Sequence, residues 1–168
     1  MRNFLLLALA GALIPVLPAA DLVWPGLLGP QRDGWVEHFK IPARWPKQLK
    51  KEWSVEVGAG YGTPLVEGQR VYQHARQGEE EVVWCFDLAS GKQIWRKSYK
   101  NPFKIGGGGE RHGKGPKSCP VMADGRLFTL SITGMIHAWD VESGSLLWRK
   151  DYRGKWEKGN QPNWGVST

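Results

Sequence analysis

The chain contains two stretches, CFDLASGKQIW at residues 85–95 and AWDVESGSLLW at residues 138–148, whose similarity decides the fold. Both have the pattern small-x-Asp-x-x-Ser-Gly-x-x-x-Trp, and the second begins 53 residues after the first. Self-similarity at a fixed spacing of some tens of residues is the signature of a repeat protein. We therefore expect one structural unit to occur twice.

The similarity extends upstream of these stretches. PLVEGQRVY at 64–72 aligns with PVMADGRLF at 120–128, at an offset of 56 residues. We assign the three-residue difference between the offsets to a hairpin tip at residues 77–81, because hairpin tips tolerate insertions. Glycine-containing turns then separate four short strands in each unit. The expected strands are 63–66, 70–75, 81–87 and 93–97 in the first unit, and 119–123, 126–131, 135–140 and 146–150 in the second.

Four-stranded units that recur about every fifty residues indicate a β-propeller. We therefore expect an all-β chain, a partial β-propeller of four-stranded antiparallel blades. In each unit an aspartate starts a tight turn, a glycine supplies its backbone conformation, and a tryptophan packs toward the neighbouring blade. These residues are structural rather than catalytic: Asp87, Gly91 and Trp95 in the first unit, and Asp140, Gly144 and Trp148 in the second.

These motifs resemble the tryptophan-docking repeat of the PQQ-like β-propeller family. That family includes quinoprotein alcohol dehydrogenases and the propeller lipoprotein of the outer-membrane β-barrel assembly machinery. Residues 24–34 also resemble the W-P-x-x-R-G-P-x-R-D-G start of exported members, with Leu28 departing from the first Arg, and residues 111–118 resemble their loop between two blades. The resemblance covers residues 24–168 and implies the fold more strongly than any chemistry.

The first twenty residues have the pattern of a secretory signal peptide, with Arg2, an apolar run at 4–17 and small residues before Asp21. The alternative is an uncleaved anchor. We expect a periplasmic or secreted protein that does not span the membrane after cleavage and carries no lipid anchor, because Asp21 and not a cysteine directly follows the expected cleavage site.

The remaining chain divides into a 21–50 N-terminal extension and an incomplete propeller at 51–168. Two blades cannot close a ring, since propellers need about four to eight blades. We expect the N-terminal part of a longer propeller, and the rival interpretation is a subunit that assembles into a ring. The propeller parts are a closing strand at 51–57, blades at 63–97 and 119–150, and the start of a next blade at 163–168.

The net charge of +7 permits an anionic partner without demanding one. An exported chain rarely meets nucleic acid, so we expect none. Cys85 and Cys119 lack zinc or thioredoxin spacing, and we interpret them as semi-buried thiols rather than a disulfide. His38, His74 and His137 stand alone in the sequence, which favours packing or surface positions over metal ligands.

The glycine-rich run GGGGERHGKGPKSCP at residues 106–120 has the spacing of a Walker A loop, but Gly115 stands where Ser or Thr should follow Lys114. No buried strand precedes it and no helix follows. We interpret it as a loop on the rim of the propeller. Its cations form a candidate anion or ligand site, and the alternative is a solvated basic connector. The candidate residues are Arg111, His112, Lys114 and Lys117.

We expect a non-enzymatic binding or scaffold module of the cell envelope, with an envelope protein or an anionic glycan as partner. Trp156 and Trp164 are candidate contact residues, and the alternative for both is packing between blades. The alternative is part of a PQQ-dependent alcohol or sugar dehydrogenase, in which the rim would hold PQQ with calcium. The resembling enzymes use adjacent cysteines and acidic calcium ligands, whereas here the cysteines are far apart and the rim is basic. We therefore assign no catalytic residue, metal ligand or cofactor unless further blades supply them.

Overall fold

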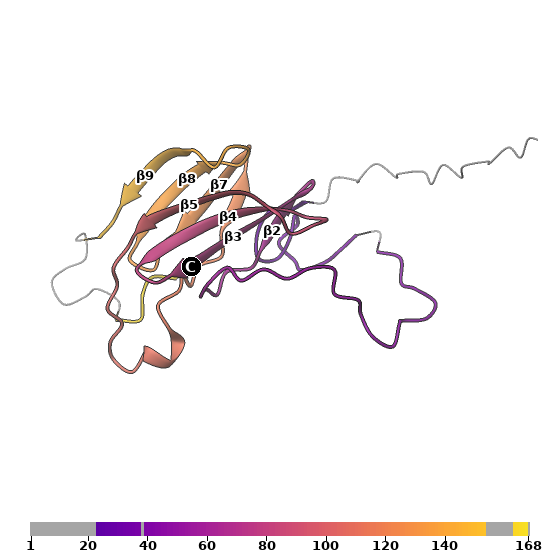
Figure 1. Ribbon diagram of the computed structural model, residues 1–168, viewed down its shortest axis with the longest axis horizontal. Helices are drawn as coiled ribbons and strands as arrows, with labels where there is room; N and C mark the ends of the chain where they lie inside the picture. Colours follow the sequence, from indigo (N-terminus) through magenta and orange to yellow (C-terminus); the bar gives the residue numbers. More distant parts are fainter. Residues whose placement is uncertain (1–22, 38, 154–162, 168) are drawn as a thin grey trace, which may run out of the picture.

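The computed structural model describes residues 23–37, 39–153 and 163–167, which form two antiparallel sheets packed face to face (Figure 1). The expected signal peptide, His38 and Trp156 lie outside the described residues. The first sheet has the order β1 (Val23–Trp24), β2 (Leu65–Glu67), β3 (Arg70–Gln77), β4 (Glu80–Asp87) and β5 (Gln93–Lys100). The second has β6 (Val121–Ala123), β7 (Arg126–Leu130), β8 (Met135–Asp140) and β9 (Leu146–Asp151).

The expected all-β class and the two four-stranded units are confirmed. Within the described residues the only helical element is a short 3-10 turn, η1 (Glu110–His112). The first sheet gains one strand that the sequence did not indicate. Val23 and Trp24 of β1 pair with Glu67 and Val66 at the free edge of β2, so part of the expected extension belongs to this sheet.

The hairpin tip between β3 and β4 is shorter than expected. Gln77 pairs with Glu80 and Arg76 pairs with Glu81, which leaves only Gly78 and Glu79 at the tip. Glu81, expected both in the tip and at the start of the next strand, lies within β4 and is fully buried. The strands extend further because the carboxylate of Glu81 finds polar partners inside the fold.

The main core lies between the two sheets. Its buried side chains come from both: Leu65, Tyr72, Val83, Cys85 and Trp95 from the first, and Met122, Leu127, Trp139 and Val141 from the second. A second apolar cluster covers the other face of the first sheet, where Trp53 and Val57 pack against Val71, Val82, Trp84 and Phe86. By contrast, every residue of β9 is exposed.

The expected closing strand at 51–57 belongs to no strand of the described structure. These residues lie over the face of the first sheet, where no strand edge is available for pairing. The nearest ladder contact is an isolated bridge between Ala59 and Arg76. Residues 163–167, expected to start a further blade, likewise form a turn and an irregular segment.

The aspartate turns are built alike in the two sheets. Asp87 accepts the backbone N–H of Ser90 at 2.8 Å, and Asp140 accepts that of Ser143 at 2.8 Å. Hydrogen bonds from the side chain and backbone of the same serine lower the pKa of each aspartate. The turns lie at the right-hand end of the sheets in Figure 1, away from the loop that joins β5 to β6.

Tryptophans dock on these turns in series. Trp95 donates from Nε1 to the carbonyl of Val141 at 3.1 Å, and its ring covers Gly144. Trp53 does the same one repeat earlier, donating to Leu88 O at 2.8 Å and covering Gly91. Trp148, the next in the series, is 46% exposed. The sequence pattern did not reveal the role of Trp53.

Candidate functional site

The loop between β5 and β6, residues 101–120, is held against the first sheet by buried polar contacts. Arg76 Nε donates to the carbonyl of Lys114 at 2.7 Å, and its guanidinium also donates to the carbonyl of Asn101. The backbone N–H of Tyr61 donates to Pro116 O at 2.9 Å. This rim loop is therefore a fixed part of the surface (lower left in Figure 1) rather than a free connector.

A buried carboxylate organises these contacts. Glu81 accepts hydrogen bonds from Tyr99 OH at 2.7 Å, from the side chain of Asn101 at 2.8 Å and from the backbone N–H of Ile132 at 3.0 Å. His74 Nε2 lies 3.2 Å from the same carboxylate. Because Ile132 belongs to the second sheet's β7–β8 turn, Glu81 links both blades to the start of the rim loop.

The electrostatics of this cluster follow from its burial. Burial opposes the charged form of Glu81, but hydrogen bonds and charge from His74, with the bond from Tyr99, hold the pKa of Glu81 below its usual range. Burial and the Glu81 carboxylate raise the pKa of Tyr99. Burial lowers the pKa of His137, whose ring centroid lies 4.1 Å from that of Tyr99, to about 4. Glu81 is therefore an anion and His137 is neutral near pH 7.

The four candidate site residues do not converge on one point. Lys114 lies 3.5 Å from Glu79, and Arg111 is exposed on η1. His112 and Lys117 do come together, because both line a shallow cavity of about 370 Å³. Their role as a ligand site stays a prediction, now centred on these two residues.

Exposed aromatic rings complete this cavity, which we call the rim pocket: Tyr61, His112, Lys117, Trp164, Gly165 and Ser167. Lys117 Nζ lies 4.6 Å from the centroid of the Tyr61 ring, and the His112 and Trp164 rings are 5.2 Å apart. Tyr61 OH donates to His112 O at 2.6 Å, and Trp164 Nε1 donates to Gly107 O at 3.0 Å. Hydrogen bonds therefore fix both aromatic residues while leaving them about half exposed.

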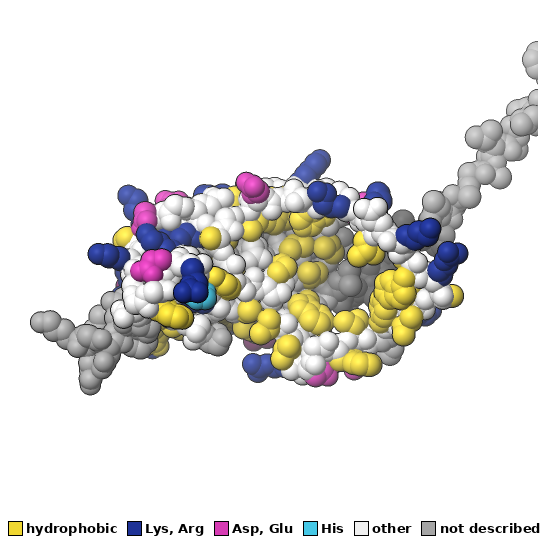
Figure 2. Space-filling view, turned by 90° about the horizontal axis from the view of Figure 1, so that it is seen from below, with side chains coloured by type: hydrophobic (Ala, Val, Ile, Leu, Met, Phe, Trp, Pro, Cys, Tyr) yellow, Lys and Arg dark blue, Asp and Glu magenta, His cyan; other side chains and the backbone are white. Residues whose placement is uncertain are grey.

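Figure 2 shows this underside of the molecule, where lysine and arginine side chains cluster beside an exposed histidine and hydrophobic side chains. Acidic side chains are also present, so the surface is mixed rather than uniformly basic. Such a surface suits a partner that carries both apolar groups and negative charge.

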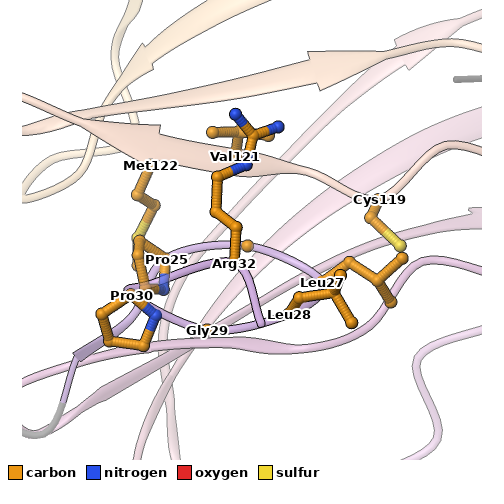
Figure 3. Close-up of a pocket in the computed structure, with 10 residues that line it drawn as sticks. Pro25, Leu27, Leu28, Gly29, Pro30, Arg32, Cys119, Val121 and Met122 are labelled. Carbon is orange, nitrogen blue, oxygen red and sulfur yellow. The ribbon is translucent and has the colours of Figure 1, made fainter. Parts of the chain in front are cut away.

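A larger cavity of about 680 Å³ lies between the N-terminal loop and β6 (Figure 3). Its lining is mainly apolar. Arg32 supplies the only charged side chain and Cys119 the only thiol among the residues that line it: Pro25, Gly26, Leu27, Leu28, Gly29, Pro30, Arg32, Cys119, Val121 and Met122. The sequence motif at 24–34 marked this segment without indicating a cavity.

The described residues do not fit a quinone–calcium site. Among residues 23–37, 39–153 and 163–167, no group of three or more His, Cys, Asp or Glu side chains is placed to hold a metal ion. Cys85 is buried in β4 and Cys119 lies near β6, and both are free thiols, as expected. We therefore derive no chemistry from such a group.

A family model described as outer membrane protein assembly factor BamB matches residues 79–159, which include six of the described strands, β4 to β9. The two sheets have the arrangement of partial β-propeller blades, and residues 79–159 are similar to the PQQ-like repeat.

Relatives agree with this assignment. The chain is 31% identical over 102 residues to the outer membrane protein assembly factor BamB of Shewanella oneidensis, and the alignment covers 57% of this chain and 25% of that protein. The chain is 30% identical over 91 residues to the BamB of Bordetella pertussis, and this alignment covers 52% of this chain and 22% of that protein. The chain thus spans about a quarter of the length of these curated relatives.

Solved structures with similar blades include BamB from Moraxella catarrhalis, with 21% identity, a TM-score of 0.42, and coverage of 59% of this chain and 26% of that one. A europium-containing methanol dehydrogenase has 24% identity and a TM-score of 0.41, and the match covers 58% of this chain and 17% of that chain.

In the described part of the chain, no helix has the length and apolar character needed to cross a bilayer.

Proposed function

We propose that this chain is an exported, non-enzymatic binding module of the cell envelope, whose rim pocket contacts an acidic surface of an envelope protein. The observation that carries the proposal is the pairing of fixed, exposed aromatic rings with a lysine and a histidine. Tyr61 is 55% exposed and Trp164 is 48% exposed, with Lys117 and His112 beside them.

Each part of the pocket has a physical role in such contact. Aromatic rings with few rotatable bonds lose little entropy on binding and are enriched at the energetic centres of interfaces. Lys117 offers three donors to a carboxylate. Further support comes from the names of the relatives, which are outer membrane protein assembly factors and therefore work with envelope proteins.

A calorimetric titration with poly-glutamate, as a defined acidic polypeptide, tests this proposal. We expect Lys117→Ala and Trp164→Ala each to weaken binding about fivefold or more, since contacts of this kind contribute about 1 kcal/mol or more. Lys50→Ala is the control, because Lys50 is an exposed cation that does not line the pocket, with a side chain 82% exposed and paired with Glu52.

Three results would contradict the proposal. One is equal affinity of the wild type and both pocket variants. Another is an equal loss in Lys50→Ala, which would indicate non-specific charge attraction. A third is binding of an anionic glycan, polygalacturonate, at least tenfold tighter than poly-glutamate, which would assign the pocket to glycan instead.

A further inference from the structure

The N-terminal loop, residues 25–34, bridges the inner edges of both blades. β1 leads into it and pairs with β2 of the first sheet, while the carbonyl of Pro25 accepts the backbone N–H of Met122 in β6 at 2.8 Å. The loop is closed on itself by a hydrogen bond from Gly34 N to Leu28 O at 2.9 Å. The cavity of about 680 Å³ lies between this loop and β6, in the size range of small-molecule sites.

Arg32 is the distinctive residue of this cavity. Its φ of 59° is left-handed, an uncommon conformation for a residue other than glycine. In Figure 3 its side chain extends from the loop toward β6, on the cavity side. No described acidic residue pairs with its guanidinium, so an exposed cation faces a cavity lined by Leu27, Leu28 and Met122.

We propose that this cavity binds a carboxylate with an aliphatic chain, the chemistry of a fatty acid. The guanidinium of Arg32 has the geometry for two parallel hydrogen bonds to a carboxylate, and the leucines and Met122 receive the chain. A peptide is a poorer ligand, because its amides would meet few side-chain hydrogen-bond partners besides Arg32. This inference goes beyond the proposed function and uses none of the rim-pocket residues.

Cys119 provides a local reporter of occupancy. Its thiol lines the cavity and is partly exposed, whereas Cys85 is buried, and burial raises the pKa of Cys85 to about 11. A maleimide reagent therefore reacts with Cys119 first. We expect octanoate to slow this alkylation in a saturable manner, and mass spectrometry of the Cys119 and Cys85 peptides measures both rates.

Variants and ligand analogues separate the two parts of the recognition. Arg32→Gln should raise the octanoate concentration for half-protection about tenfold, and Arg32→Lys should restore part of the loss. Arg44→Gln, at an exposed arginine outside the cavity, should change nothing. Each methylene added between hexanoate and octanoate should strengthen protection about fourfold, if its surface is fully buried.

Every other outcome decides against the proposal. Absence of protection by octanoate in the wild type removes the site. Equal protection of wild type and Arg32→Gln, or equal protection by octanol and octanoate, removes the role of the guanidinium. Stronger protection by N-acetyl-leucine than by octanoate assigns the cavity to a peptide terminus. A loss of poly-glutamate binding at the rim pocket leaves this inference unaffected, so the two proposals fail separately.

Discussion

At the scale of single residues, Glu81 is a buried carboxylate that joins both sheets to the start of the rim loop. It is fully buried and contacts Tyr99, Asn101, His74 and the backbone of Ile132. A buried charge is tolerated only when its hydrogen bonds are satisfied, and removing that charge leaves its buried partner groups without hydrogen bonds.

Glu81→Gln should therefore lower the free energy of unfolding by about 2 to 4 kcal/mol, because an amide cannot accept every bond that the carboxylate accepts. Glu79→Gln on the same hairpin is the control. Glu79 is exposed beside Lys114, and such pairs contribute less than about 1 kcal/mol. Urea unfolding measures both, and equal losses in the two variants would show that Glu81 is not an organising residue.

The lowered pKa of His137 predicts how the free energy of unfolding depends on pH. Its pKa is lowered by burial first and by the neighbouring His74 second, to about 4, with Glu81 and Asp151 acting in the opposite direction. Between about pH 6.5, the ordinary histidine pKa, and pH 4, His137 is protonated in the unfolded chain but stays neutral in the folded chain. This contribution to stability is present above about pH 6.5 and is lost as the pH falls toward 4.

Replacing His137 with Phe tests this linkage. Phe keeps the ring contacts with Tyr99 and Trp139 and removes Nδ1, a buried atom without a hydrogen-bond partner in the described structure. The free energy of unfolding of His137→Phe should fall less than that of the wild type between pH 6.5 and pH 4. Parallel pH profiles for the two proteins would contradict the assignment.

At the scale of structural elements, docking of a tryptophan on a glycine turn joins the blades. Gly144 has a φ of 67°, and a Cβ there would lie 2.7 Å from the Trp95 ring. Gly125 has a φ of 68° but nothing within 4 Å of its Cβ position. The two glycines therefore share the backbone requirement and differ in the contact.

Gly125→Ala should cost about 1 to 2 kcal/mol, the penalty for placing a side chain in the left-handed region. Gly144→Ala should cost about 1 to 3 kcal/mol more, because the added methyl displaces the Trp95 ring. Thermal or urea unfolding of both variants measures the difference. Equal losses would mean that the Trp95 contact contributes nothing to blade docking.

The sequence predicted the strands and the glycine turns because those features repeat locally within each unit. It placed Glu81 where the hairpin tip meets the strand, because the difference between the two repeat offsets falls there, and it could not show the burial of Glu81 because the partners Asn101 and Ile132 lie distant in the chain. The rim pocket was only partly predictable for the same reason. The glycine-rich run marked the loop, but the contact of Trp164 with Gly107 spans 57 residues.

At the scale of the whole molecule, no group of three or more His, Cys, Asp or Glu side chains among the described residues is placed to hold a calcium ion. We therefore expect the purified chain, dialysed against PQQ with calcium, to retain no stoichiometric quinone and to reduce no artificial electron acceptor with alcohols or sugars. Quinone absorbance in proportion to protein would favour the dehydrogenase interpretation over the binding module.

The central claim is that the rim pocket is where this module meets an acidic partner, and a residue-resolved NMR titration with a short poly-glutamate peptide tests it most directly. We predict that the largest chemical-shift changes fall on Tyr61, His112, Lys117 and the Trp164 indole, and that they shrink in Trp164→Ala. Changes spread evenly over exposed lysines and arginines, or confined to residues outside the rim pocket, would contradict the claim.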